Sequence, residues 1–161
     1  MTPQPKTDVV ATFRIATADD VPRLHDLYRQ LIPDADPDET LMVKALETLF
    51  ARDDAVYIVM AEVDGLPIAT LQLIVYENLI RVPFKKAIID SVVVDEPYRH
   101  QGHGTALVEW SLDHLTSLNC SIVTVSTAFH RDVAPKLYEK TGFTRFGTTF
   151  SVDLRKRAGK A

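Results

Sequence analysis

The sequence predicts an α/β protein with a mixed (α+β) sheet that carries helices on both faces. Apolar segments rich in β-branched residues alternate with segments whose apolar residues recur at helical spacing. Together they give the order β-α-α-β-β-β-α-β-α-β, in which a helix joins two strands that should run parallel. The strand at 87–94 is expected to lie centrally in the sheet.

Length and composition indicate one globular domain. The chain has 161 residues, of which 46% are hydrophobic and 25% are charged, and this is enough for a core of its own. We expect a loose lead-in at 1–11, the domain at 12–154 and a basic tail at 155–161. The net charge of -4 argues against a nucleic-acid-binding protein.

The single cysteine, Cys120, excludes an internal disulfide and fits a reducing compartment. No signal-like core or apolar run of membrane-spanning length is visible in the sequence. We therefore expect a cytoplasmic protein that does not bind membranes.

The first third of the chain predicts a short strand and two helices. The strand at 12–15 is followed by a helix that Thr17 or Asp19 can cap. A second helix is expected at 37–51, with Asp36 as its cap. The residues expected on its core side are Leu41, Ala45, Leu46, Leu49 and Phe50.

The middle of the chain predicts an antiparallel hairpin. Segments 56–62 and 68–76 are apolar and flank Asp64-Gly65, a dipeptide typical of tight hairpin turns. The remaining elements are expected to be a strand at 87–94, a helix starting between His103 and Thr105, a strand at 121–127, a helix at 133–141 that stops before Gly142, and a last strand or hairpin at 143–154.

The loop between the strand at 87–94 and the following helix is a candidate phosphate site. Pro97 should end the strand near Val94, and the amides of the helix start point back into a loop that holds Gly102 and Gly104. Arg99, His100 and His103 add positive character there, and such a loop suits a phosphate. The alternative is an ordinary glycine turn. A Walker-type loop is excluded because no Gly-Lys-Ser/Thr follows, and a dinucleotide fingerprint because Leu107 replaces its third glycine.

Two segments resemble motifs of the GCN5-related N-acetyltransferase (GNAT) family. Arg99-His100-Gln101-Gly102-His103-Gly104 matches the pyrophosphate-binding pattern Gln/Arg-x-x-Gly-x-Gly/Ala. Residues 134–143, with Tyr138, Gly142 and Phe143, are similar to the pattern Ala-x-x-Phe/Leu-Tyr-x-x-x-Gly-Phe. The resemblance implies a three-layer α/β/α fold, acetyl-CoA as co-substrate without a metal, and acetyl transfer to an amine.

The resemblance also implies which residues bind acetyl-CoA. The backbone of the strand end is expected to meet the pantetheine amides, and the loop and helix start the pyrophosphate. Carried over by motif position, the cofactor-binding residues are Val92, Val93, Val94, Arg99, His100, Gln101, Gly102, His103, Gly104, Thr105 and Arg131.

Tyr138 and Asp90 are the candidate catalytic residues. Tyr138 matches the family's tyrosine, and a phenol stays protonated at neutral pH and can donate to a departing thiolate. Its alternative role is packing beside Leu137. Asp90 lies in an otherwise apolar strand, where an unpaired carboxylate is costly and a raised pKa plausible, so it is a candidate base or amine anchor. Many family members have Glu at this place, and the shorter side chain can require a bridging water.

The sequence says least about which amine accepts the acetyl group. Arg131, after His130, stands where many relatives have Asn. It resembles the arginine of family members that act on small anionic amines, where it would bind the anionic group. The alternatives are that it binds the 3'-phosphate of CoA or that it is a surface residue. The acidic stretch at 34–39 could attract a cationic amine or serve only its helix start.

Three functions therefore stay open on the sequence alone. The first is acetylation of a small amine such as an aminoalkylphosphonate or an amino sugar phosphate. The second is acetylation of a protein lysine or N-terminus. The third is a CoA-binding regulatory module without turnover. A homodimer is also left open.

Overall fold

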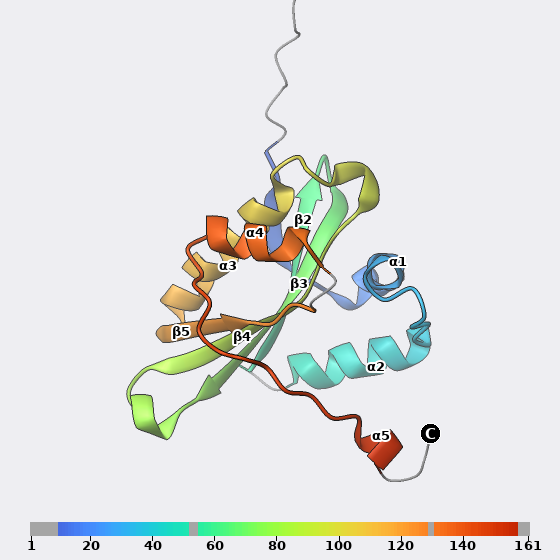
Figure 1. Ribbon diagram of the computed structural model, residues 1–161. Coiled ribbons are helices and arrows are strands. Elements are labelled where there is room, and N and C mark those ends of the chain that lie inside the picture. Colours follow the sequence, from blue (N-terminus) through green and yellow to red (C-terminus); the bar gives the residue numbers. More distant parts are fainter. Residues whose placement is uncertain (1–9, 52–54, 129–130, 158–161) are drawn as a thin grey trace, which may run out of the picture. The chain divides into compact units, whose positions relative to one another are not determined.

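The computed structural model describes residues 10–51, 55–128 and 131–157 (Figure 1). The chain divides into two compact units, Met1–Val125 and Ser126–Ala161. Most of the expected lead-in, and residues 158–161 of the expected tail, lie outside the described residues. No helix in the described ranges is both long and apolar enough to cross a bilayer.

The first unit is built on a five-stranded mixed sheet. Its strands follow each other in chain order, and each pair is antiparallel except the last, which is parallel. The parallel pair confirms the crossover expected from the sequence. The strands are β1 (Thr12–Ile15), β2 (Val56–Val63), β3 (Leu66–Glu77), β4 (Lys85–Val94) and β5 (Cys120–Val125).

The strand expected at the centre, residues 87–94, is interior but not central. It belongs to β4, which pairs with β3 on one side and β5 on the other, so β3 is the middle strand. The difference arises because the expected last strand does not join the sheet among the described residues.

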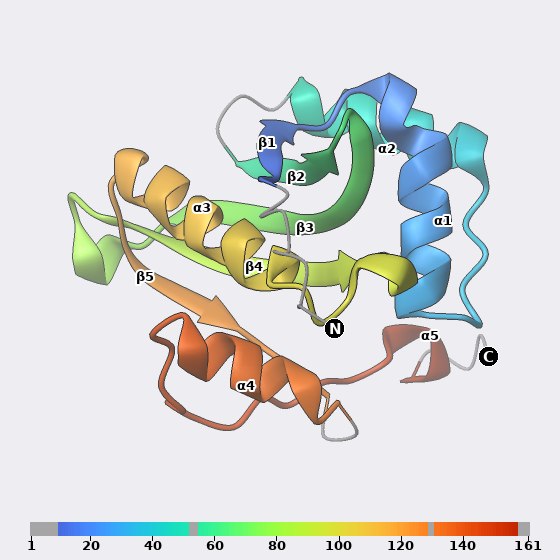
Figure 2. The same cartoon turned by 90° about the horizontal axis from the view of Figure 1, so that it is seen from above.

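Helices cover both faces of this sheet, as predicted. The short 3-10 turn η1 (Ala18–Asp20), α1 (Val21–Leu31) and α2 (Glu39–Phe50) lie on one side, and α3 (His103–Ser117) lies on the other (Figures 1 and 2). Leu24 and Leu27 of α1 pack with Met60 of β2 in a buried cluster. On the opposite side α3 contacts β2 to β5 and buries Leu107 and Leu115.

The hairpin of β2 and β3 forms around the predicted turn. Asp64 and Gly65 both have positive φ, 51° and 77°, which is the backbone of the two-residue turn that matches strand twist. Asp tolerates this conformation better than most residues, and Gly adopts it freely. The turn dipeptide thus sets the register of β2 against β3 next to the turn, up to the irregularity between Ala61 and Glu62.

The helix starts differ partly from prediction. Thr17 is the cap before η1, and the Asp20 carboxylate accepts its backbone N–H at 2.7 Å. In α2 the cap is Asp38, whose carboxylate accepts the Leu41 N–H at 3.0 Å, and not Asp36. The helix begins at Glu39, two residues later than the expected start at 37, because Asp38 rather than Asp36 accepts a hydrogen bond from the first turn.

The buried face of α2 also differs from prediction. Leu46 is buried, and Met42 and Val43 pack against the same cluster. Leu41 is 63% exposed, and Ala45 and Phe50 are exposed as well. The helix contacts β2 and α1 along its 42/43/46 side, so tertiary packing selected a narrower stripe than the apolar pattern offered.

The second unit holds α4 (Val133–Lys140) and the short α5 (Leu154–Arg157), which begins at the last residue of the expected domain and runs into the expected tail. The last strand or hairpin expected at 143–154 is not formed: residues 143–153 have no strand structure. Phe146 and Phe150 in this segment are 96% and 91% exposed. Their β-type composition describes a local preference only, whereas a strand also needs a ladder partner.

Candidate functional site

The site predicted from the sequence begins at a β-bulge near the end of β4. Gln72 of β3 pairs with Asp90, but Thr70 pairs with Val93, so two residues of β4 face Leu71 alone. One of them is Ser91, with φ of 53°, a conformation rare outside glycine. The other is Val92, so the bulge interrupts the ladder at the first of the predicted cofactor residues.

The pairing between β4 and β5 also stops at this point. Register runs from Lys85 with Cys120 to Ile89 with Val125. Among the described residues, 90–94 have no partner in β5, and this stretch includes Val92, Val93 and Val94. Backbone N–H and C=O groups of this stretch are thereby available to a ligand, except the Val94 carbonyl, which accepts a hydrogen bond from Arg99.

The predicted phosphate loop follows directly. After β4 the chain makes a 3-10 turn, η3 (Glu96–Tyr98), and reaches Gly102, which has φ of 90° and is the cap residue of α3. No side chain caps this helix start, and a Cβ on Gly102 would meet nothing within 4 Å. The first amides of α3, including those of Gly104 and Thr105, therefore begin the helix beside open space, as an anion site requires.

The side chains of the loop do not all contribute as expected. His103 is only 7% exposed and meets the Tyr98 ring edge to face at 6.1 Å between centroids, so its imidazole packs inside the loop rather than adding positive character outside it. Gln101 donates from Nε2 to the Pro97 carbonyl at 2.8 Å. His100, with φ of 61°, and Arg99 are exposed.

Arg99 is held by two hydrogen bonds. Its Nε donates to the Val94 carbonyl at 2.9 Å, and its Nη2 donates to Oε1 of Gln30 at 3.0 Å. Gln30 lies near the end of α1, far from the loop in sequence. Sequence reasoning missed this residue, because nothing in a helical apolar pattern identifies which polar residue beside the stripe will contact a distant loop.

The surroundings of Asp90 correct the expectation that led to its selection. Its side chain is exposed rather than buried in an apolar strand, and its Oδ1 accepts the Ser91 N–H at 2.7 Å. Its proposed role as base or amine anchor stays a prediction.

Tyr28 of α1 is a second residue that sequence reasoning missed. Burial raises the pKa of Tyr28 to about 12, against a side-chain hydrogen bond with Thr70, and the charge of Asp90 adds to the rise. The phenol is thus close enough to Asp90 to feel its charge. In the sequence, Tyr28 lies in the apolar helical pattern with Leu24 and Leu31, so it was interpreted as a core residue.

Tyr138 lies in α4 of the second unit and is 8% exposed. Its ring meets Phe143 edge to face at 5.8 Å, and the Phe143 N–H donates to the Tyr138 carbonyl at 2.9 Å. Gly142 makes the turn between them with φ of 89°. The tyrosine, glycine and phenylalanine of the second motif therefore form one local arrangement at the end of a helix, as the predicted stop before Gly142 requires.

Arg131 precedes α4, and its backbone N–H donates to the Ala128 carbonyl at 3.0 Å. Phe129 and His130 lie outside the described residues. The assignment of Arg131 to a phosphate, to an acceptor anion or to the surface stays a prediction.

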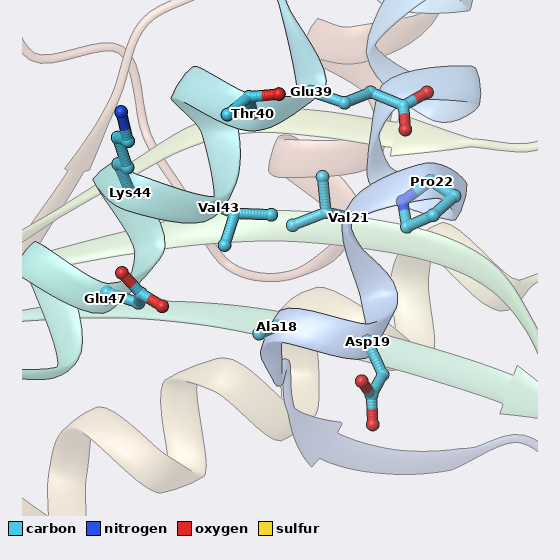
Figure 3. A pocket seen from close by; sticks show the side chains of 9 residues that line it. All are labelled: Ala18, Asp19, Val21, Pro22, Glu39, Thr40, Val43, Lys44 and Glu47. Carbon is cyan, nitrogen blue, oxygen red and sulfur yellow. The ribbon is translucent and has the colours of Figure 1, made fainter.

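A hollow of about 620 Å³ lies between η1, the start of α1 and α2 (Figure 3). Three carboxylates, Asp19, Glu39 and Glu47, line it together with Lys44. None of the predicted site residues lines this hollow, and of the acidic stretch at 34–39 only Glu39 does. Within the described ranges there is no group of three or more His, Cys, Asp or Glu residues arranged to hold a metal ion.

Part of the chain is similar to N-alpha-acetyltransferase 30 of Dictyostelium discoideum. The two sequences are 32% identical over 66 residues, which cover 41% of this chain and 36% of that protein. The chain therefore spans about a third of the curated relative it matches.

Solved structures match over a larger share. A protein from Agrobacterium tumefaciens str. C58, provisionally named an acetyltransferase, has a TM-score of 0.81 and 29% identity over 88% of this chain and 99% of that one. Glucosamine-6-phosphate N-acetyltransferase from Arabidopsis thaliana has a TM-score of 0.78 and 23% identity over 89% of this chain and 98% of that one, which shows a shared fold.

The family model of the acetyltransferase (GNAT) family matches residues 21–143. This range runs from the start of α1 to Phe143, so it contains the bulged β4, the phosphate loop and the second motif. The chain belongs to the acetyltransferase (GNAT) family.

Proposed function

We propose that this protein transfers the acetyl group of acetyl-CoA to the primary amine of a small molecule. The observation that carries the proposal is the continuous run from the bulged end of β4 through the glycine loop to the uncapped start of α3. Strand-edge backbone suits the amides of pantetheine, and the helix start suits the pyrophosphate. Family membership supports the same co-substrate.

Within this proposal the chain's own residues supply proton transfer. Asp90 accepts a proton from the amine, directly or through a water, as the amine nitrogen attacks the acetyl carbonyl carbon. A backbone N–H at 92–94 stabilises the oxyanion that forms. The hydroxyl of Tyr138, proposed from its motif position, gives a proton to the sulfur as the carbon–sulfur bond breaks.

The acceptor class we favour is a small anionic amine, such as an aminoalkylphosphonate or an amino sugar phosphate. The support is Arg131, a guanidinium at the position before α4 where relatives often have Asn, since its planar fork suits a phosphonate, phosphate or carboxylate. A cytoplasmic location belongs to the same proposal and rests on the single cysteine, Cys120, because one cysteine cannot form an internal disulfide. Burial raises the pKa of its thiol, which lowers the fraction present as the reactive thiolate.

A second candidate is acetylation of protein N-termini. The observation that favours it is the partial match to N-alpha-acetyltransferase 30. A panel that contains 2-aminoethylphosphonate, glucosamine 6-phosphate, glucosamine and short peptides with free N-termini separates the two candidates. Our proposal predicts that thiol release from acetyl-CoA is fastest with the phosphorus-containing amines; fastest release with peptides would favour the second candidate.

Binding of CoA is tested separately from turnover through Gly102. Gly102→Val should weaken CoA binding by at least about tenfold, because a branched residue is strained at φ of 90° and its side chain would enter the open space over the loop. Calorimetric titration measures the affinity, with Gly65→Val at the hairpin turn as a control that carries similar backbone strain away from the loop. Equal CoA affinity in Gly102→Val and the parent would refute the placement of the pyrophosphate.

CoA binding by the parent without turnover on any amine would instead indicate a regulatory module.

A further inference from the structure

The loop that follows β4 is tied to α1 by a compact set of polar contacts that the proposed reaction does not use. They converge on the side-chain amide of Gln30, which is half-buried near the end of α1. Its Oε1 accepts the Glu96 backbone N–H at 3.0 Å and Nη2 of Arg99 at 3.0 Å. Its Nε2 donates to Oδ1 of Asp95 at 2.7 Å. One amide thus contacts three residues at the start of the phosphate loop.

Asp95 is itself fixed from the other side. Its second oxygen pairs with Nη2 of Arg23, which lies about two turns before Gln30 on α1. The Asp95 backbone N–H donates to the Ile68 carbonyl of β3 at 2.8 Å. Nε of Arg23 donates to the Pro67 carbonyl at 2.8 Å. Burial of Asp95 opposes its ionisation, but the bonds from Gln30 and Arg23 outweigh it and lower the pKa of this carboxyl below its usual value. The carboxylate is therefore charged and locked at neutral pH.

The orientation of the Gln30 amide follows from this arrangement. Its NH₂ group must face the Asp95 carboxylate, so its oxygen must face the two donors on Glu96 and Arg99. Arg99 then donates from Nε to the Val94 carbonyl and from Nη2 to Oε1 of Gln30. Because the guanidinium is planar, these two acceptors together fix its orientation. Because Arg99 is exposed, its charge remains open to a ligand.

We propose that Gln30 is a positioning residue for acetyl-CoA: it orders the loop from Asp95 to Gly102 before the ligand arrives and aims Arg99 at the pyrophosphate. This inference rests on the proposed function. A loop that is already ordered loses little conformational freedom on binding, so Gln30 raises affinity without touching the ligand. Its contribution therefore belongs in the binding of acetyl-CoA and not in the chemical step.

Removing the amide tests the proposal. Gln30→Met keeps the length of the side chain and loses all three contacts, and it should raise the Kd for CoA and the KM for acetyl-CoA about tenfold, since bonds to charged partners are lost. The kcat at saturating acetyl-CoA should stay within twofold of the parent. The matched control is Arg29→Met, a neighbouring exposed residue of α1 whose Nε lies 3.9 Å from Oδ1 of Asp36, and its Kd should not change.

Exchanging the donor and the acceptor gives a rescue experiment. Gln30→Glu alone places two carboxylates against each other and should weaken CoA binding. In the double variant Gln30→Glu with Asp95→Asn, the amide at position 95 donates to the carboxylate at position 30, and that carboxylate can still accept from Glu96 and Arg99. The double variant should therefore recover most of the lost affinity for CoA. A double variant no better than Gln30→Glu alone would count against the proposed geometry.

Amide hydrogen exchange without ligand separates positioning from general stability. In Gln30→Met the amides at 95–102 should exchange faster, whereas those of β2 and β3 should match the parent. A parent that fails to bind CoA would overturn the proposed function itself. A parent that binds CoA while Gln30→Met binds it within twofold, or exchanges faster across the whole sheet, would overturn the positioning role alone.

Discussion

The two proposed catalytic residues lie in very different surroundings. Tyr138 is 8% exposed and packs against Phe143, whereas Asp90 is exposed and bonds the N–H of its own neighbour, Ser91. A buried phenol is held in a fixed position by its neighbours, which suits a donor. An exposed carboxylate beside a bulge is open to water, which suits a base that acts through a water molecule.

Tyr138→Phe removes only the hydroxyl and keeps the ring contact with Phe143. If that hydroxyl protonates the departing thiolate, kcat should fall roughly a hundredfold while the affinity for acetyl-CoA is retained. Single-turnover measurement at saturating amine is the suitable test, because slow product release cannot then mask the chemical step. A Phe variant as fast as the parent would make Tyr138 a packing residue.

Asp90→Asn keeps the size of the side chain and its bond to Ser91 while removing the base. Turnover should fall most at low pH, where the amine is mostly protonated and a base is needed to release its nucleophilic form. Profiles of kcat/KM against pH for the parent and the variant should converge as the pH approaches the pKa of the amine. Parallel profiles over the whole range would remove Asp90 from the mechanism.

Residues contiguous in the sequence were the ones that could be predicted. The loop at Arg99 to Gly104 and the run from Tyr138 to Phe143 are each local, so their patterns carry their geometry. Tyr28 and Gln30 could not be recognised, because their importance arises from contacts with Asp90 and Asp95 across the fold. The inward turn of His103 was missed for the same reason.

Elements whose ends carry specific turn chemistry matched the prediction best. The Asp64-Gly65 turn set the β2–β3 hairpin, and Gly102 and Gly142 mark the start of α3 and the end of α4. Each of these residues has a positive φ that few other residues accept. Local backbone preference was therefore sufficient at these places.

Elements that depend on a partner were predicted less well. The segment at 143–153 has strand composition and forms no strand, and α2 buries Leu46 while exposing Leu41. The bulge at Ser91 was also invisible, since its sequence is a plain run of β-branched residues around one aspartate. Pairing and packing decide such features, and a single sequence does not display them.

At the scale of the whole first unit, an aromatic cluster joins α3 to β1 and β2 of the sheet. Trp110 stacks on Phe13 of β1 at 5.8 Å and on His114 at 5.2 Å, and Tyr57 of β2 meets His114 edge to face at 5.3 Å. Nε2 of His114 is buried and has no hydrogen-bond partner among the described residues. Burial lowers the pKa of His114 below its usual value.

This cluster predicts that the protein loses stability in mild acid. The unfolded state takes up the His114 proton at a higher pH than the folded state does, so the stabilisation is complete above about pH 6.5 and declines as the pH falls below it. His114→Phe keeps an aromatic ring in the stack and removes the titration, so its urea midpoint should depend less on pH between about 5 and 7. Identical pH dependence in the parent and the variant would exclude His114 as the cause.

The position of α1 links two specificities that are usually considered separately. This helix brings Tyr28 toward Asp90 and, two residues later, Gln30 to the loop proposed to bind the pyrophosphate. A substitution that tilts or shifts the helix to admit a different amine will also displace the acceptor of Arg99. New acceptor preferences should therefore arise together with changes in co-substrate affinity, and directed evolution of this protein will need compensating changes at Asp95 or Arg99 to separate them.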